Sequence, residues 1–214
     1  LFVLGVDRRR ASVTVAAGLA ALAAVWAGGS ARLASPSADT VAGVRLRVVQ
    51  PNIPQHLKWK PELRAGHVRR LIELSLAPAA GGVRPTHVVW PETAVPYNVW
   101  ADARLRAAMS AAVPEGGLLI TGAPRSEPAA DGSIRAFNSV HAIDRSGALV
   151  ATYDKRHLVP FGEYVPLRGL FGFAKLTAGR VDFQVGTTPR LFDWAGLPPV
   201  AVLVCYEVIF PAEV

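Results

Sequence analysis

Three residues with the chemistry of a covalent catalyst lie far apart in the chain: Glu92, Lys155 and Cys205. A cysteine nucleophile needs a base that accepts its proton and a cation that stabilises the oxyanion of the tetrahedral intermediate. A carboxylate and an ammonium group meet these two needs. The three residue types therefore indicate chemistry through a thiol, on condition that the fold brings them together.

Each of these residues also has an ordinary structural explanation. Glu92 follows a proline and could be a solvated loop carboxylate, and Lys155 lies between two charged residues and could be a surface lysine. Cys205 is the only cysteine; such a thiol is either an inert buried side chain or a reactive group. The combination favours chemistry, because each residue follows a predicted strand and one end of one sheet could present all three.

The segments that must position these residues have the pattern of an α/β domain. Residues 44–48 alternate apolar residues with arginines, which predicts a strand with one covered face. Helical spacing of apolar residues predicts helices at 62–77 and 101–112. Short apolar runs predict the remaining strands, at 87–90, 118–120, 137–143, 149–153 and 200–204.

The order of these elements predicts the architecture. Asp144-Arg145-Ser146-Gly147 is a turn signal between two predicted strands and indicates a β-hairpin. The succession strand, helix, strand, helix, strand and hairpin favours a sheet that is covered by helices on at least one side.

An apolar segment precedes this domain. Residues 11–29 carry no charge over 19 positions, and as a helix they would extend about 28 Å, close to the hydrocarbon thickness of a bilayer. A signal peptide usually has a shorter apolar core, and this segment is apolar on all faces and Ala-rich, so a transmembrane helix is favoured over a signal peptide and over a buried helix of a soluble protein. The charged residues 7–10 place the preceding end in the cytoplasm by the positive-inside rule.

The predicted organisation has four parts. Residues 1–10 form a cytoplasmic-side flank, 11–30 a transmembrane helix, 31–43 a linker, and 44–214 a catalytic domain. Because a strand that leads into the Cys205 turn should be followed by further elements, the domain is expected to be incomplete at its C-terminus.

Composition excludes some other classes. The net charge is +7, but no basic run recurs after residue 10, so nucleic-acid binding has little support. The chemistry requires no metal or other cofactor, and the five histidines show no spacing typical of metal ligands: His56, His67, His87, His141 and His157.

Three motifs occur in the order found in the nitrilase superfamily, whose members use a Glu–Lys–Cys triad. They are Trp90-Pro91-Glu92, the fourteen residues 153–166 (Tyr-Asp-Lys-Arg-His-Leu-Val-Pro-Phe-Gly-Glu-Tyr-Val-Pro), and Cys205-Tyr206-Glu207. Within that superfamily, the segment 49–55 followed by Lys58-Trp59 resembles the opening strand and loop of the apolipoprotein N-acyltransferase family. The fourteen-residue motif is the most specific, and the resemblance covers about residues 10 to 214.

The resemblance implies an αββα sandwich on the periplasmic face of the bacterial inner membrane, with further membrane helices before it and one after it. It also implies a ping-pong reaction. Cys205 would take an acyl group from a membrane phospholipid as a thioester, and the α-amine of a diacylglyceryl-cysteine apolipoprotein would then accept that group.

The same resemblance implies a role for each matched residue. Glu92 would shuttle the proton and Lys155 would stabilise the oxyanion. Glu163 would support Lys155, while Tyr206 and Glu207 would shape the pocket beside the nucleophile. Weaker matches at the pocket wall and the lipid entrance are Trp59 and Asn138.

Two other functions stay open from the sequence. An amidase or nitrilase of the same superfamily would share the triad but release the acyl group to water. A membrane-anchored binding module with an inactive triad would share the motifs without forming an acyl-enzyme.

Overall fold

A computed structural model describes residues 8–34, 40–165 and 182–210. The chain divides into two compact units, Leu1–Thr40 and Val41–Val214. Parts of the predicted flank and linker, and Pro166 at the end of the fourteen-residue motif, lie outside the described residues.

The first unit contains one long helix, α1 (Arg8–Ala34). An 18-residue window within Arg9–Ala34 has a mean hydropathy of 1.7, so the helix is long and apolar enough to cross a membrane. The predicted helix is therefore present, but it continues past residue 30 into the predicted linker. Ala31, Arg32 and Leu33 explain the extension, because all three are good helix formers.

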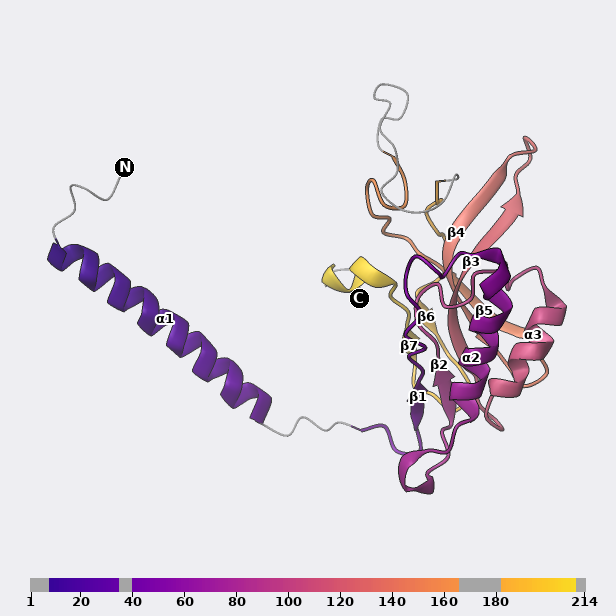
Figure 1. Cartoon of the computed structure of the whole chain (residues 1–214), viewed down its shortest axis with the longest axis horizontal. Helices are drawn as coiled ribbons and strands as arrows, with labels where there is room; N and C mark the ends of the chain where they lie inside the picture. Colours follow the sequence, from indigo (N-terminus) through magenta and orange to yellow (C-terminus); the bar gives the residue numbers. More distant parts are fainter. Residues whose placement is uncertain (1–7, 35–39, 166–181, 211–214) are drawn as a thin grey trace. The chain divides into compact units, whose positions relative to one another are not determined.

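The second unit is built on a five-stranded mixed sheet in the order β1-β2-β3-β4-β5 (Figure 1). The first two pairings are parallel and the last two are antiparallel. A two-stranded antiparallel sheet, β6-β7, accompanies it. The strands are β1 (Leu46–Val48), β2 (His87–Val89), β3 (Leu119–Pro128), β4 (Ile134–Ile143), β5 (Leu149–Asp154), β6 (Leu191–Phe192) and β7 (Val200–Ala201).

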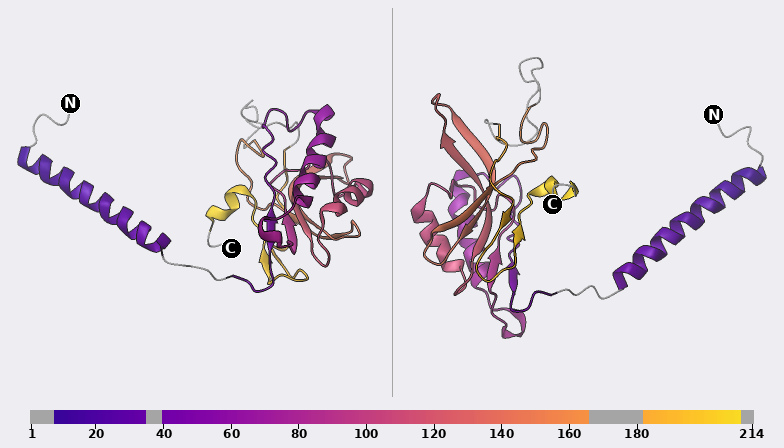
Figure 2. Two further views of the ribbon diagram at one scale, coloured as in Figure 1. Left: turned by 60° about the horizontal axis from the view of Figure 1, so that its bottom comes forward. Right: turned by 180° about the vertical axis from the view of Figure 1, so that it is seen from behind.

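Helices cover one face of the main sheet, as the sequence predicts. These are α2 (Arg64–Leu76) and α3 (Ala103–Met109), and both views in Figure 2 show them on the side away from β6 and β7. Short 3-10 helices occur at Pro61–Leu63, Ala80–Gly82, Ser110–Ala112 and Cys205–Ile209. The core of this face is fully buried and includes Leu71, Val88, Met109, Leu119 and Ile143.

The other face of the sheet packs against the segment that carries β6 and β7. Its core includes Tyr153, Trp194, Val202 and Val204. Because side chains alternate between faces along a strand, neighbouring residues of β4 and β5 belong to different layers. This alternation separates the residues of the candidate site from a polar group on the helix face.

Several strands differ in length from their prediction, and β3 and β7 are examples with a clear cause. β3 extends to Pro128 rather than ending at residue 120, because it pairs with β4 residue by residue as far as Pro128–Ile134. β7 ends at Ala201 rather than residue 204, because its partner β6 has only two residues.

The predicted covered face of the first strand is not covered in the described part of the chain. Leu46 is 54% exposed and Val48 is 75% exposed. Arg47 explains the orientation, because its guanidinium donates to the carbonyl oxygens of Ser75 and Ala77 at the end of α2. The apolar side chains of β1 therefore point to the opposite face.

Candidate active site

The three predicted catalytic residues each lie at the end of a segment of the sheet. Glu92 lies in the turn after β2, Lys155 directly follows β5, and Cys205 begins the 3-10 helix that follows β7 and Val204. β1, β2 and β3 run in the same direction, and β5 shares that direction because β4 is antiparallel to both β3 and β5. β1, β2 and β5 therefore end at the same edge of the sheet. The topology therefore explains how Glu92 and Lys155, 63 positions apart in the sequence, come to the same edge.

Glu92 is exposed, and one of its carboxylate oxygens is held by a side chain of β4. Asn138 Nδ2 donates to Glu92 Oε1 at 2.8 Å. Lys58 Nζ donates to the backbone carbonyl oxygen of Glu92 at 3.4 Å. Burial lowers the pKa of Lys58, and attraction to Glu92 opposes that shift. The candidate base thus has both a fixed carboxylate and a nearby cation.

Lys155 is buried, with 1% of its surface exposed, and it has a carboxylate partner. Its Nζ lies 2.8 Å from Glu163 Oε2, which also accepts from the backbone N–H of Val159 at 2.9 Å. Asn138 Nδ2 donates to the other oxygen, Glu163 Oε1, at 2.7 Å. These contacts form a continuous chain from Glu92 through Asn138 and Glu163 to Lys155.

Cys205 has an exposed thiol and an unusual backbone. Its φ is 55°, in the left-handed region that costs a residue with a side chain roughly 1–2 kcal/mol. Thr93, beside Glu92, has φ 49°, and Phe161, in the loop after Lys155, has φ 62°. Such strained conformations concentrate at functional sites, where the surrounding structure holds them.

Glu207 joins the Cys205 turn to the segment that follows Lys155. Its Oε1 accepts from Tyr153 Oη at 2.8 Å and from the backbone N–H groups of Arg156 and His157 at 2.9 Å and 3.0 Å. Its Oε2 accepts from the N–H of Val204 at 2.8 Å. Burial and the hydrogen bond to Glu207 raise the pKa of Tyr153 to about 12. The buried carboxylate of Glu207 therefore links the Cys205 motif to the fourteen-residue motif.

A second contact between the same two segments is aromatic. The rings of His157 and Phe210 stack with centroids 4.1 Å apart. Tyr206, in contrast, is 56% exposed beside the nucleophile, and Trp59 is half-buried, with its carbonyl oxygen accepting from Arg64 at 3.2 Å. Of the two weaker candidates, Asn138 is thus part of the hydrogen-bonded network, whereas Trp59 lies at a more open position, as does the predicted supporting residue Tyr206.

Glu92 and Cys205 line the same pocket, which has a volume of about 450 Å³. Its walls are mainly apolar and include Trp90, Ile120 and Val202. A carboxylate and a thiol at an apolar cavity suit a substrate with an apolar part and a reacting carbonyl group. Within residues 8–34, 40–165 and 182–210, no three His, Cys, Asp or Glu side chains are grouped to hold a metal ion.

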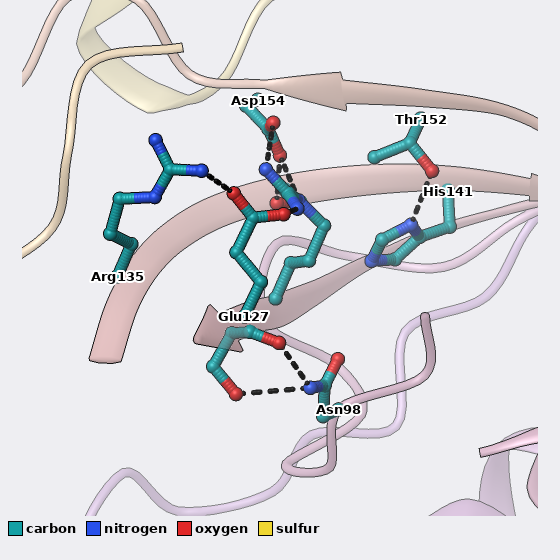
Figure 3. Close-up of polar contacts among 9 residues, drawn as sticks. Asn98, Glu127, Arg135, His141, Thr152 and Asp154 are labelled. Carbon is teal, nitrogen blue, oxygen red and sulfur yellow. Dashed lines mark hydrogen bonds and ion pairs between the residues drawn. The ribbon is translucent and has the colours of Figure 1, made fainter. Parts of the chain in front are cut away.

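The strand end before Lys155 is fixed from the opposite face of the sheet. Asp154 is buried, and its carboxylate accepts two hydrogen bonds from Arg125, at 2.7 Å and 3.0 Å, and one from Ser139 Oγ at 2.6 Å. Figure 3 shows Asp154 in a polar group with Glu127. This arrangement holds β5 in place where Lys155 leaves it.

Sequence reasoning predicted a role for Glu207 but found neither its partner Tyr153 nor the pair Asp154 and Arg125. The contacts of Glu207 with Tyr153 and of Asp154 with Arg125 join residues 54 and 29 positions apart. Both Tyr153 and Asp154 belong to the fourteen-residue motif, and that membership was the one signal that could have indicated a role for them.

Comparisons with known proteins agree with the motifs. The profile of the carbon-nitrogen hydrolase family matches residues 45–214. The chain is 38% identical to an apolipoprotein N-acyltransferase of Bradyrhizobium diazoefficiens over 97% of its length, and 36% identical to one of Rhodopseudomonas palustris over 98%. A protein of the same name from Brucella suis is 41% identical over 82% of the chain.

The chain spans only part of these relatives: 40%, 41% and 34% of their respective lengths. A solved structure with a similar fold is a CN-hydrolase superfamily protein from Xanthomonas campestris. It has a TM-score of 0.54 and 20% sequence identity, with 81% of this chain and 57% of that chain covered. This likeness confirms the predicted fold class.

Proposed function

Because the chain belongs to the carbon-nitrogen hydrolase family, we propose that it is the catalytic part of a membrane acyltransferase that acts through Cys205. The observation that carries this proposal is the hydrogen-bonded chain from Glu92 to Lys155, next to a pocket that Glu92 and Cys205 line together. The relatives named apolipoprotein N-acyltransferase support acyl transfer over other reactions of the family.

In the first half of the proposed reaction, the sulfur of Cys205 attacks an ester carbonyl of a membrane phospholipid. Glu92 takes the thiol proton, and the ammonium group of Lys155 stabilises the oxyanion. When the ester C–O bond breaks, Glu92 returns the proton to the leaving alkoxide. The products are a thioester on Cys205 and a lysophospholipid.

In the second half, the α-amine of a diacylglyceryl-modified N-terminal cysteine attacks the thioester carbonyl. Glu92 takes a proton from the amine and returns it to the departing sulfur as the C–S bond breaks. An amide forms on the apolipoprotein, and the thiol of Cys205 is restored. Proton transfer by one carboxylate in both halves balances the cycle without a cofactor.

A site beside the bilayer suits the lipid donor. Moving acyl chains into water would expose many CH₂ groups, each at a cost of about 0.8 kcal/mol. We infer that α1 anchors the chain in the bacterial inner membrane, because its apolar stretch is long enough to span it. The arginines that begin α1 favour a cytoplasmic N-terminal end and a periplasmic catalytic domain.

The proposal is tested with the full-length enzyme, a phospholipid and a diacylated lipopeptide. Wild-type protein should form an acyl adduct on Cys205 and N-acylate the lipopeptide, as measured by mass spectrometry. Cys205→Ala should abolish the adduct. Glu92→Gln and Lys155→Ala should each lower the rate of adduct formation by about 100-fold or more, by analogy with the loss of other oxyanion donors and bases.

Exposed residues of the same types provide matched controls. Glu115 and Lys60 are exposed and lie outside the site, so Glu115→Gln and Lys60→Ala should leave the rate unchanged. Release of free fatty acid without N-acylation of the lipopeptide would favour an amidase of the same superfamily. A wild-type enzyme that forms no adduct would favour a binding module instead.

A further inference from the structure

Asn138 makes two contacts that no local feature of its sequence explains. Its amide nitrogen Nδ2 donates to Glu92 Oε1 at 2.8 Å and to Glu163 Oε1 at 2.7 Å. An asparagine amide nitrogen carries two hydrogens, so each carboxylate takes one of them. The backbone carbonyl oxygen of Asn138 also accepts from the backbone N–H of Lys155 at 2.9 Å. Asn138 thus touches all three charged residues of the network.

A hydrogen-bond donor between the two carboxylates is favoured by the electrostatics of this arrangement. Two carboxylates that share one nitrogen lie close together and repel each other. Lys155 pairs with only one of them, Glu163. Asn138 binds both carboxylates as a donor and adds no charge of its own. Because Asn138 is 5% exposed, water cannot readily take its place.

We propose that Asn138 is a positioning residue that fixes the Glu92 carboxylate and couples it to the Glu163–Lys155 pair. The inference deepens the proposed function, because it rests on Glu92 as the base and Lys155 as the oxyanion cation. The Asn138 amide donates a hydrogen bond to Oε1 of Glu92 and so fixes the orientation of the carboxylate that takes the proton of the thiol. The same amide donates to Glu163 and so fixes the position of the carboxylate that pairs with the Lys155 ammonium group.

Two simpler roles make different predictions. A buried asparagine that only satisfies its neighbours would affect stability but not the rate of the chemical step. A pocket-wall residue that contacts the substrate would affect KM for the phospholipid. A positioning residue affects kcat and leaves KM nearly unchanged, because the carboxylate and the ammonium group lose their geometry in the transition state.

Asn138→Asp gives the sharpest test, because it keeps the size and shape of the side chain. When ionised, the new carboxylate cannot donate, and it adds a third negative charge beside Glu92 and Glu163. When protonated, it has one O–H donor and can restore one of the two hydrogen bonds. The charged groups around this position are Glu92, Glu163, Lys155 and, beside Glu92, Lys58.

The experiment measures acyl-adduct formation on Cys205 in the full-length enzyme between pH 6 and pH 8. Asn138→Ala should lower kcat by about 100-fold, with KM for the phospholipid within about threefold of wild type. Asn138→Asp should be slower still at pH 8, and its rate relative to wild type should rise as the pH falls. This recovery occurs within one folded preparation, so it cannot be ascribed to misfolding.

Asn98, in the loop between β2 and α3, provides a matched control outside the hydrogen-bonded network of Asn138. Its Nδ2 also makes two hydrogen bonds, to the carbonyl oxygen and the hydroxyl of Ser126 at 2.8 Å and 3.0 Å (Figure 3). Asn98→Ala and Asn98→Asp should leave kcat within about threefold of wild type and give no recovery at low pH.

A second readout separates this inference from the proposed function. Alkylation of Cys205 by iodoacetamide needs no natural substrate and reports how readily the thiol loses its proton. Asn138→Ala and Asn138→Asp should slow alkylation at pH 7, and the Asn98 variants should not. Equal alkylation rates in wild type and both Asn138 variants would overturn the positioning role. A wild-type enzyme that is alkylated but transfers no acyl group would overturn the proposed function alone.

Discussion

At the scale of single residues, burial on the helix face of the sheet controls the protonation of His141. Its side chain is fully buried, with Nδ1 3.0 Å from Thr152 Oγ1, and Nε2 has no hydrogen-bond partner in the described part of the chain. Burial lowers the pKa of His141 to about 4, and attraction to Asp154 does not offset this effect. His141 is therefore neutral in the folded protein at physiological pH.

This shift predicts a loss of stability in acid. The unfolded chain binds a proton at His141 near pH 6.5, whereas the folded protein binds it only near pH 4, so protons favour the unfolded state between these values. From pH 7 to pH 5, His141 should lower the free energy of unfolding by about 2 kcal/mol. Urea unfolding of the detergent-solubilised chain at both pH values measures the effect.

The contribution of His141 is isolated by substitution. His141→Gln should unfold with about 2 kcal/mol less pH dependence than wild type over this range. His56→Gln, at an exposed histidine, should keep the wild-type pH dependence. If His141→Gln and wild type lose the same stability in acid, the proton is bound elsewhere.

At the scale of elements, the Glu92 turn rests on the backbone of β3 at Gly122. A Cβ at this position would lie 2.6 Å from Thr93 N, 2.7 Å from Glu92 Cα and 2.8 Å from Pro91 O. All three are backbone atoms, so no flexible side chain can move aside. Glycine at position 122 is thus needed for the close approach that sets Glu92 at the sheet edge.

Gly122→Ala should displace the Glu92 turn. The expected cost is about 1–3 kcal/mol of stability, as for other overpacked sites. Adduct formation on Cys205 should fall about 10- to 100-fold, because small displacements of catalytic groups are costly. Gly66→Ala is the matched control, since no atom lies within 4 Å of the added Cβ and alanine favours α2. A Gly122→Ala enzyme with wild-type rate would show that the turn can shift freely.

Elements with local signals could be predicted from the sequence, and elements held by distant partners could not. The turn at Asp144–Gly147 and the helix beginning near Pro61 follow from turn and helix-start residues. Gly122 and Pro124 are typical of loops, yet both lie within β3 because β4 pairs along its whole length.

The same distinction holds for the candidate site. The motifs predict Glu92, Lys155 and Cys205 as site residues, because each lies in a short recognisable segment. Asn138 reaches its carboxylate partners across 46 and 25 positions of the sequence. The register of β4 with both β3 and β5 brings these side chains together, so a single sequence could indicate Asn138 as no more than a wall residue.

At the scale of the whole molecule, the two units differ in whether their apolar side chains are exposed or buried. The apolar side chains of α1 are exposed, among them Val15, Leu22 and Trp26 at 62%, 71% and 74%. Such a surface is stable in a bilayer and not in water. The unit that carries Cys205 has its own buried cores on both faces of its sheet.

The only cysteine of the chain is also a natural probe of orientation, because the thiol of Cys205 is exposed. If the arginines before the apolar stretch remain in the cytoplasm, Cys205 lies outside the inner membrane. A membrane-impermeant maleimide should then label the 214-residue chain in intact spheroplasts, as measured by the mass shift of the protein. Cys205→Ser should take no label, and detergent-treated spheroplasts give the full extent of labelling. Labelling that requires detergent would place the unit that carries Cys205 in the cytoplasm and contradict the proposed orientation.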